Sequence, residues 1–594
     1  MKYKVLGGKI GENILETVLY NRGIFDKNLF INPDNSSDSD LDLIINIDKG
    51  IKLIKDNLHK NILVLVDSDC DGITSGSIMY KYLKMINPGA NISYYLHDGK
   101  KHGLTKEFME YLGGEDVDLI IVPDAGSNDI ENIEKIVKVY GADILIIDHH
   151  EIEKESKYGT IINNQICDNT NKNLTGAGMV LRFCEKLNEE YNFDIDELKN
   201  LAMLGLISDT ADLTDNEVRN ICLTSIKGIK NKFIKTFYEM KEKDLNNLTM
   251  KDLSFGGVIP LINAVLRVGT IEERIKLFET LADIVDEEKV TCIEKRKLNK
   301  ETRKYERVPF YFNEYEVMVE ECEKIKTRQN KLVEKTIKEL EKEFCEFTGI
   351  QFFIVEADEE IKGITGLIAM KLAEKFSQPV IIAWLNEDGY YYGSLRGNEK
   401  VMPDFKAWCL DTGLFEWVQG HANAAGLCID DINFAKLHDA ATKVTPQEFI
   451  YEVDYEYNKI LPLQDVLLIG RNKGLWGNGC KEPLFVIKDV IVPKMAIQHS
   501  KNTLRIWVNG VTYIKFRTPE SEYEDLKFKC GFGETIKMNF MGNFSINEYM
   551  GKENPQVLIT DYEVIKEEKE EVDIFAQAAA TLAPKEQNIF SIFD

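Results

Sequence analysis

Carboxylates and histidines of this chain gather in two short segments whose residue types suit metal-assisted phosphate chemistry. Asp67-Ser-Asp69-Cys-Asp71-Gly72 alternates three carboxylates, and Asp148-His149-His150 places two imidazoles behind another. Divalent cations that activate water prefer carboxylate oxygens and imidazole nitrogens, and a pair of cations needs a bridging carboxylate and further acidic groups. The two segments therefore predict a metal site that hydrolyses a phosphate ester.

A calcium loop is the main alternative for the first segment, because D-x-D-x-D-G also begins an EF-hand. An EF-hand needs a glutamate at its twelfth position, and this position is Ile78. It also needs a preceding helix, whereas an apolar run of strand length, Asn61 to Val66, stands here. For a single Asp at a strand end a helix N-cap is the ordinary alternative, and for a single His it is a buried structural role.

Three apolar runs without polar alternation precede these acidic residues. They are Asn61 to Val66 before Asp67, Val117 to Val122 before Asp124, and Asp143 to Ile147 before Asp148. Such runs are typical of strands in a parallel sheet that is covered on both faces. Since ligands bind at the carboxyl ends of such strands, we expect the acidic residues to meet at one sheet edge.

The bulk properties describe a multidomain globular protein. Its 594 residues exceed one hydrophobic core, and its 11 cysteines include no C-x-x-C pair. The sequence shows no signal peptide or membrane-spanning run, which predicts a cytoplasmic protein without a membrane partner. The net charge of −26 argues only weakly against a nucleic-acid partner, because bound cations reverse the local sign of an acidic site.

Later segments predict further domains. Alternating Glu and Lys around residues 316–347 favour one long, solvated connecting helix. A second α/β unit follows from about residue 351, and short β runs separated by turns after residue 449 suit a small barrel.

Four motifs occur in the order of the DHH phosphoesterase superfamily, and within it the chain resembles the RecJ single-strand exonucleases. They are Asp67 to Gly72, Asp124-Ala-Gly126, Asp148 to His150 and Ser208-Asp209. The resemblance implies two divalent cations, Mn²⁺ or Mg²⁺, and a catalytic group formed by Asp148, His149 and His150. The implied metal ligands are Asp67, Asp69, Asp71, Asp124, His149 and Asp209.

Three further segments resemble substrate-binding parts of RecJ proteins: Pro260 to Arg267, Gly393 to Arg396 and Gly420 to Gly426. The implied substrate-binding residues are Asn263, Arg267, Ser394, Arg396, Gly420 and His421. The chain departs from the family where Lys100-Lys-His-Gly103 replaces the usual Arg-x-x-x-Gly-Tyr-Gly, and where Gln419 replaces a glycine. These departures put end-group recognition and length preference in question.

The C-terminal β region is similar to the oligonucleotide-binding (OB) fold of RecJ proteins, in which aromatic side chains stack on bases. Trp476, Trp507 and Tyr549 are candidates for stacking or for the core. In the tail, Gln587, Phe590 and Phe593 resemble a peptide that docks on a sliding clamp, and equally the tip of a single-strand-binding protein; chance aromatics are the alternative.

The sequence thus predicts a monomeric multidomain α/β protein. The expected parts are a parallel-sheet DHH domain with an N-terminal extension (1–275), a helical connector (276–348), a DHH-associated substrate-binding domain (349–445), an OB-type barrel (446–565) and a flexible tail (566–594). The resemblance implies a 5′→3′ exonuclease that releases mononucleotides from single-stranded DNA in repair, recombination or replication, and single-stranded RNA is the alternative to DNA as its substrate. Alternatives are an oligoribonucleotide or cyclic-dinucleotide phosphodiesterase and a non-catalytic single-strand-binding subunit.

Overall fold

The computed structural model describes residues 1–99, 101–166, 170–298, 303–344, 349–356, 358–442, 444, 449–529, 535–549 and 551–565. The chain divides into two compact units. The larger unit comprises residues 26–449 and 474–481, and the smaller comprises residues 1–25, 450–473 and 482–594.

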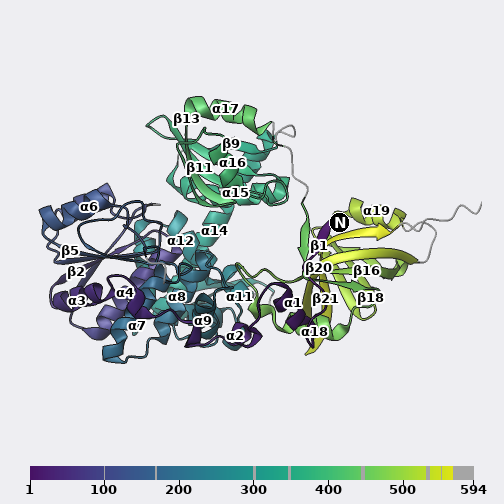
Figure 1. The fold of residues 1–594 in the computed structure, drawn as a ribbon, viewed down its shortest axis with the longest axis horizontal. Helices are drawn as coiled ribbons and strands as arrows, with labels where there is room; N and C mark the ends of the chain where they lie inside the picture. The colour runs from purple at the N-terminus through teal and green to yellow at the C-terminus, as the bar shows by residue number, and fades with distance from the viewer. Residues whose placement is uncertain are drawn as a thin grey trace, which may run out of the picture. The chain divides into compact units, whose positions relative to one another are not determined.

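The larger unit begins with a five-stranded, entirely parallel sheet in the order β3-β2-β4-β5-β6 (Figure 1). Its strands are β2 (Asn61–Val66), β3 (Asn91–Leu96), β4 (Leu119–Pro123), β5 (Asp143–Asp148) and β6 (Thr160–Asn163). Ile62 and Val64 enter one hydrophobic core, whereas Leu63 and Leu65 enter the other. The apolar runs lack alternation because both faces are covered, which confirms the predicted parallel sheet.

Helices cover both faces of this sheet, with α6 on the side opposite α3 and α4 (Figure 1). The helices of this part of the chain, some of which pack on other helices and not on the sheet, are α2 (Lys27–Ile31), α3 (Ile47–Asn57), α4 (Cys70–Ile86), α5 (Lys106–Leu112), α6 (Ile130–Lys135), α7 (Gly176–Tyr191), α8 (Asp196–Ser208), α9 (Asn216–Ile226), α10 (Lys232–Met240), α11 (Met250–Ser254), α12 (Val258–Val268) and α13 (Ile271–Leu281). In the described part of the chain, no helix combines the length and apolarity needed to cross a bilayer.

The predicted helical connector contains a long helix, but an antiparallel hairpin precedes it. The hairpin is formed by β7 (Thr291–Leu298) and β8 (Tyr305–Phe312), and the helix is α14 (Glu314–Leu340). Asn313 caps α14 by accepting a hydrogen bond from the Glu316 backbone N–H, and Glu316 accepts one in return. The predicted long helix is thus present, and the connector 276–348 also contains a β-hairpin, which was not predicted from the sequence.

A second α/β part follows in the same unit, with the sheet order β12-β13-β11-β10-β9. Its elements are β9 (Gln351–Ile354), α15 (Glu359–Phe376), β10 (Val380–Leu385), β11 (Tyr390–Arg396), α16 (Phe405–Asp411), β12 (Trp417–His421), β13 (Ala424–Asp430) and α17 (Asp431–Ala441). The sequence predicted this part and two of its strands.

The smaller unit is built on a seven-stranded sheet in the order β15-β16-β20-β21-β19-β18-β17. Its elements are β1 (Tyr3–Val5), α1 (Ile14–Asn21), β14 (Tyr451–Val453), β15 (Tyr455–Asn458), α18 (Leu463–Arg471), β16 (Leu484–Pro493), β17 (Ile497–Ser500), β18 (Thr503–Val508), β19 (Val511–Phe516), α19 (Glu520–Lys529), β20 (Thr535–Tyr549) and β21 (Lys552–Ile565). The parallel β19–β21 pair among antiparallel neighbours matches the predicted barrel type.

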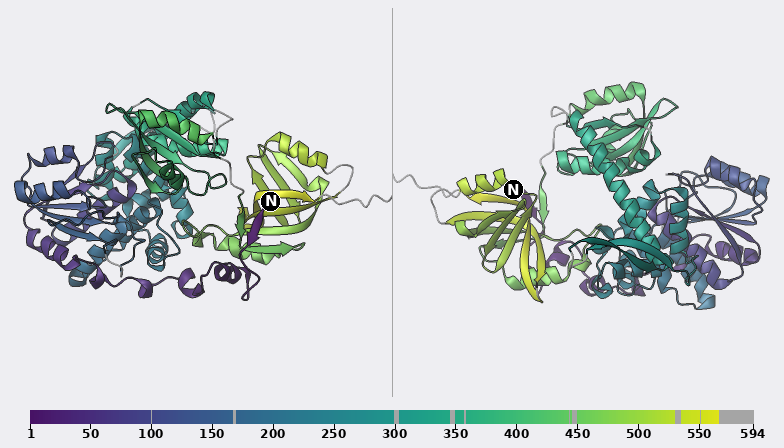
Figure 2. Two further views of the ribbon diagram at one scale, coloured as in Figure 1. Left: turned by 45° about the horizontal axis from the view of Figure 1, so that its top comes forward. Right: turned by 180° about the vertical axis from the view of Figure 1, so that it is seen from behind.

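Residues 1–25 were predicted to belong to the first domain, but in the structure they belong to this β unit. Strand β1 pairs in parallel with β14, and the N-terminus lies beside these strands in Figures 1 and 2. Arg22 Nε lies 2.6 Å from Oδ1 of Asp454, whose side chain is only 2% exposed. The N-terminal segment therefore supplies a strand and a buried ion pair to a fold whose other residues lie more than 400 positions away.

Candidate metal centre

The first cluster of carboxylates lies where β2 ends and α4 begins. Asp67 is buried directly after the strand, and Asp69 caps α4 by accepting a hydrogen bond of 2.9 Å from the Gly72 backbone N–H. Asp69 therefore both caps the helix and belongs to the carboxylate cluster. Asp71 is buried in the first helical turn, where the positive end of the helix dipole favours a carboxylate.

Asp71 is fixed by the start of α7. It accepts hydrogen bonds from the Thr175 hydroxyl (2.8 Å), the Gly176 backbone N–H (2.7 Å) and the Ala177 backbone N–H (3.1 Å). A Cβ on Gly205 of α8 would lie 2.3 Å from Oδ1 of Asp71. Glycine at this position therefore lets α8 approach the carboxylate closely.

Asp124 follows β4 in a left-handed backbone conformation, with φ of 67°. Aspartate adopts this conformation more readily than most residues do. Its backbone N–H donates to the Ile147 carbonyl on β5 at 2.7 Å. A Cβ on Gly176 would lie 2.2 Å from Oδ1 of Asp124, so only glycine leaves room for this carboxylate.

Asp148 organises the two histidines at the end of β5. Its carboxylate accepts hydrogen bonds from the Ser127 backbone N–H (3.1 Å), the His149 backbone N–H (2.7 Å) and His150 Nδ1 (2.7 Å). Burial opposes its charge, but the bond and charge of His150 hold the pKa of Asp148 well below its usual range. Asp148 is therefore an anionic support for His150.

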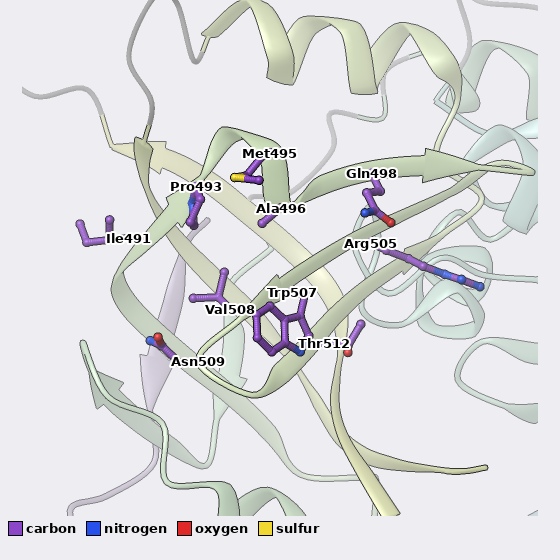
Figure 3. A pocket seen from close by; sticks show the side chains of 10 residues that line it. All are labelled: Ile491, Pro493, Met495, Ala496, Gln498, Arg505, Trp507, Val508, Asn509 and Thr512. Atoms are coloured by element: carbon purple, nitrogen blue, oxygen red, sulfur yellow. The ribbon is translucent and has the colours of Figure 1, made fainter. Parts of the chain in front are cut away.

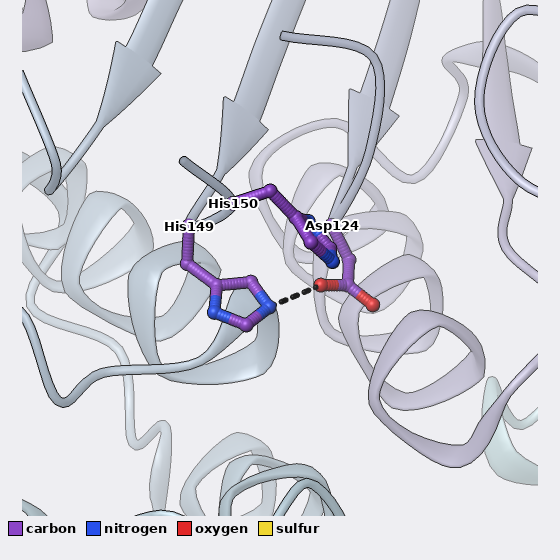
Figure 4. A group of neighbouring side chains, drawn as sticks. All are labelled: Asp124, His149 and His150. Carbon is purple, nitrogen blue, oxygen red and sulfur yellow. Dashed lines mark ion pairs between the residues drawn. The ribbon is translucent and has the colours of Figure 1, made fainter. Parts of the chain in front are cut away.

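His149 points into the carboxylate cluster and faces Asp124 (Figure 4). Its Nε2 lies 3.2 Å from Asp124 Oδ1, 3.8 Å from Asp71 Oδ2 and 3.9 Å from Asp209 Oδ2. Asp209 ends α8 as its C-cap residue. Three carboxylates thus converge on a single imidazole nitrogen: one follows β4, one lies in the first turn of α4 and one caps the end of α8.

Among the residues that the structure describes, three groups of side chains have ligand atoms within 4.8 Å of one another, the spacing that suits a bound metal ion. They are Asp67, Asp69 and Asp124; Asp71, His149 and Asp209; and Asp124, His149 and His150. Because Asp124 and His149 each belong to two groups, the arrangement can bridge neighbouring cations.

The cluster is electrostatically strained without a cation. Burial, followed by repulsion from Asp71, raises the pKa of Asp124 well above its usual value. Burial, followed by repulsion from Asp71 and Asp69, raises the pKa of Asp209 to about 7. Oδ1 of Asp67 and Oδ1 of Asp124 are buried and make no hydrogen bond in the described structure. Unpaired buried oxygens among crowded carboxylates fit divalent cations well.

His102 joins this site, although the sequence indicated it only as a departure from the family pattern. Its Nδ1 lies 2.6 Å from Asp67 Oδ2, and its ring centroid lies 4.8 Å from that of His150. Burial opposes protonation, but the bond to Asp67 raises the pKa of His102 to about 9. A charged donor thus stands beside Asp67 and His150.

Asn263 and Arg267 lie four residues apart on α12 and therefore share one helix face. Burial lowers the pKa of Arg267, whereas the charge of nearby Asp69 raises it. The sequence did not single out Lys326 on α14, whose pKa is lowered to about 8 by burial and then by the charge of Arg267. This part of the site is cationic, in contrast to the carboxylate cluster.

The second α/β part presents Arg396 and His421 at one end of its sheet. Arg396 on β11 pairs with Ala424 on β13, which pairs in turn with His421 on β12. Directly opposite residues lie on one face, so both side chains share the face that α15 covers. Burial lowers the pKa of Arg396 to about 10, and the positive charge of Arg267 adds to this effect. Both residues lie against α15, because a Cβ on Gly363 would lie 2.4 Å from the Arg267 carbonyl oxygen and a Cβ on Gly366 would lie 2.6 Å from Arg396 Nη2.

The remaining predicted residues of this part have separate roles. The hydroxyl of Ser394 is buried and lies 2.9 Å from the Thr365 hydroxyl on α15. Gly420 has φ of 128°, and a Cβ there would lie 2.7 Å from the Ala424 carbonyl oxygen. Ser394 is thus positioned by α15, and Gly420 shapes the tight β12–β13 turn.

In the β unit, Trp507 lies in a groove of about 510 Å³ and is 64% exposed (Figure 3). Arg505, Gln498 and Asn509 also line this groove. Trp476 is only 4% exposed and belongs to the core. The side chain of Tyr549 and the tail residues Gln587, Phe590 and Phe593 lie outside the described residues, so their roles stay predictions.

Two family models match the chain. The model of the DHH family, N-terminal domain, matches residues 61–206, which include β2 to β6 and the Asp148 segment. The model of the RecJ OB domain matches residues 469–561. The two matches coincide with the parallel-sheet domain and the C-terminal β unit.

Relatives and solved structures extend the likeness over most of the chain. The SPbeta prophage protein YorK of Bacillus subtilis, provisionally named a single-strand DNA-specific exonuclease, is 34% identical over 96% of this chain and 100% of its own length. RecJ of Bacillus subtilis is 23% identical over 86% of this chain and 63% of its own length. The crystal structure of Thermus thermophilus RecJ with Mn²⁺ matches 95% of this chain and 80% of its own, with 18% identity and a TM-score of 0.71.

Proposed function

Because this chain belongs to the RecJ family of DHH phosphoesterases, we propose that it is a metal-dependent exonuclease that hydrolyses single-stranded DNA. The observation that carries the proposal is the set of overlapping ligand groups at the sheet edge, with buried carboxylate oxygens left unpaired. The relatives named as single-strand DNA-specific exonucleases support the substrate class.

The residues proposed to hold two divalent cations, Mn²⁺ or Mg²⁺, are Asp67, Asp69, Asp71, Asp124, His149 and Asp209. When bound, such cations lower the pKa of water and offset negative charge on the phosphate oxygens. The chain's own contribution is to fix the buried carboxylates: the start of α7 donates hydrogen bonds to Asp71, and Gly176 and Gly205 leave room for Asp124 and Asp71.

His150 and His102 are proposed to bind the scissile phosphate. Burial opposes protonation of His150, but its hydrogen bond to Asp148 raises its pKa, so its imidazolium donates hydrogen bonds to an anion. The Asp148 carboxylate also fixes the ring orientation. Asp148, His149 and His150 thus remain the catalytic group, with Asp148 acting through His150.

Arg267, Arg396 and His421 are proposed to bind the terminal phosphate of the strand, supported by Asn263, Ser394 and Gly420. The two guanidinium groups lie close enough for their charges to interact, and an anion between them relieves this repulsion. Fixing a strand end beside the catalytic group releases one mononucleotide in each cycle. We propose 5′→3′ digestion and, since DNA is the substrate, a cytoplasmic location.

The test is cleavage of 5′-labelled and 3′-labelled single strands with Mn²⁺, Mg²⁺ or a chelator. Asp148→Ala and Asp209→Ala should abolish cleavage, whereas Asp56→Asn, at an exposed position of α3, should leave it unchanged. Full activity of either alanine variant would overturn the catalytic assignment. Faster hydrolysis of a dinucleotide than of a long strand would overturn the substrate assignment.

A further inference from the structure

The β7–β8 hairpin is a basic element in an acidic protein. Between Thr291 and Phe312 the sequence has seven Lys or Arg residues and three Glu residues, although the whole chain has a net charge of −26. The hairpin lies outside the segments that the DHH and RecJ OB models match. Neither the metal centre nor the proposed substrate residues use it.

One face of the hairpin is anchored. Lys295 forms an ion pair with Glu320 of α14, and its Nζ lies 4.7 Å from the ring centroid of Phe312. Phe312 is buried and stacks with Phe310 on the same face. These contacts fix the base of the hairpin on α14 and leave the opposite face to solvent.

The opposite face exposes two arginines between two tyrosines. Arg296 pairs across the strands with Arg307, Tyr305 stands opposite Leu298, and Tyr311 stands opposite Cys292. Arg307 is 75%, Tyr311 70% and Tyr305 69% exposed. Residues two apart on a strand share a face at a spacing of roughly 7 Å.

Two features of this face lack a structural purpose within the described chain. Like charges directly opposite each other destabilise a strand pair, yet Arg296 and Arg307 occupy one cross-strand position. Glu294, whose Oε2 lies 3.5 Å from Arg307 Nη1, partly offsets their charge. Exposed tyrosine rings on both sides of the arginines add flat apolar surface that packs against nothing described.

We propose that this face binds a single-stranded nucleic acid. The arginines would pair with phosphates, and Tyr305 and Tyr311 would stack on bases, the combination by which proteins hold single strands with little sequence preference. Charge complementarity selects the occupant, because the hairpin is positive where most of the chain is negative. The inference goes beyond the proposed exonuclease, since strand binding here requires no cleavage.

The test measures fluorescence anisotropy of a labelled single strand in EDTA over a salt series, so that hydrolysis does not intervene. The variants are R296A/R307A, Y305A/Y311A and a control, K49A/K52A, which removes two exposed cations from α3. R296A/R307A should weaken binding about tenfold and reduce the slope of log K against log salt by about 1.4. Y305A/Y311A should weaken binding at least about fivefold with an unchanged slope.

Thermal unfolding of each variant checks that it folds. We expect all of them to fold, because the four substituted hairpin side chains are exposed. The proposal is overturned if R296A/R307A and Y305A/Y311A bind the strand with the same affinity and salt slope as K49A/K52A. An acidic protein surface would then be the partner that the exposed hairpin face fits. Cleavage of a trinucleotide, measured in parallel with Mn²⁺, keeps the two hypotheses apart. A chain that binds through the hairpin but does not cleave contradicts only the exonuclease.

Discussion

Asp124→Asn should make the metal-free protein more stable while it removes activity. Asp124 Oδ1 is buried without a hydrogen bond, and its charge is opposed by Asp71. A buried unsatisfied polar atom costs about 1–3 kcal/mol, and the amide removes the charge while its N–H can donate to His149 Nε2, now 3.2 Å from that oxygen. For a cooperative unit of about 250 residues this corresponds to an increase in Tm of about 2–6 °C.

Divalent cations should make the parent chain more stable than Asp124→Asn. A site filled at a hundredfold excess over its Kd stabilises the native state by about 2.7 kcal/mol. Mn²⁺ should therefore raise the Tm of the parent chain by several degrees and raise that of Asp124→Asn much less.

Calorimetry of both chains and of the control Asp56→Asn, with EDTA and with Mn²⁺, measures these effects. Asp56 lies exposed on α3, so its variant should follow the parent in both conditions. A metal-free Asp124→Asn chain less stable than the parent, or an equal response of both chains to Mn²⁺, would refute the assignment of Asp124 as a strained metal ligand.

Three more outcomes are expected. Burial and neighbouring carboxylates raise the pKa of Asp209 from 3.8 to about 7, so the metal-free fold should lose stability as the pH rises from 3.8 to about 7. Over the same pH range the increase in Tm that Mn²⁺ causes should grow. Calorimetry at stepped pH measures both effects. Gly176→Ala should abolish Mn²⁺ stabilisation and cleavage because its Cβ would displace Asp124, whereas Gly228→Ala, which meets nothing within 4 Å, should preserve both. Trp507→Ala should weaken binding of long strands about fivefold or more without slowing hydrolysis of a trinucleotide; an unchanged affinity would contradict stacking at this groove.

The sheet edge shows how local patterns can predict a site. Each of the runs before Asp67, Asp124 and Asp148 contains at least four consecutive apolar residues, which favours strands that are buried on both faces. Parallel strands direct their carboxyl ends to the same edge, and the order β2-β4-β5 makes these three strands neighbours. Strand periodicity and chain direction therefore predicted the shared sheet edge, and the strand order made the three strand ends neighbours.

Other features depended on contacts that no local pattern encodes. His102 stands in a polar segment that could have been an ordinary loop, and only the fold places its Nδ1 beside Asp67. Residues 1–25 are short and weakly patterned, and only pairing of β1 with β14 assigns them to the C-terminal unit.

By itself, the sequence determined the residue types of the metal centre, the strands that carry them and the order of the main parts. These follow from short-range periodicity, which a chain keeps whatever its neighbours are. Tertiary structure alone decided that Asp124 and His149 are shared between ligand groups, that Trp476 is core whereas Trp507 is exposed, and that the 291–312 hairpin presents its arginines to solvent. Those properties depend on burial and distances between residues remote in the chain, which only packing fixes.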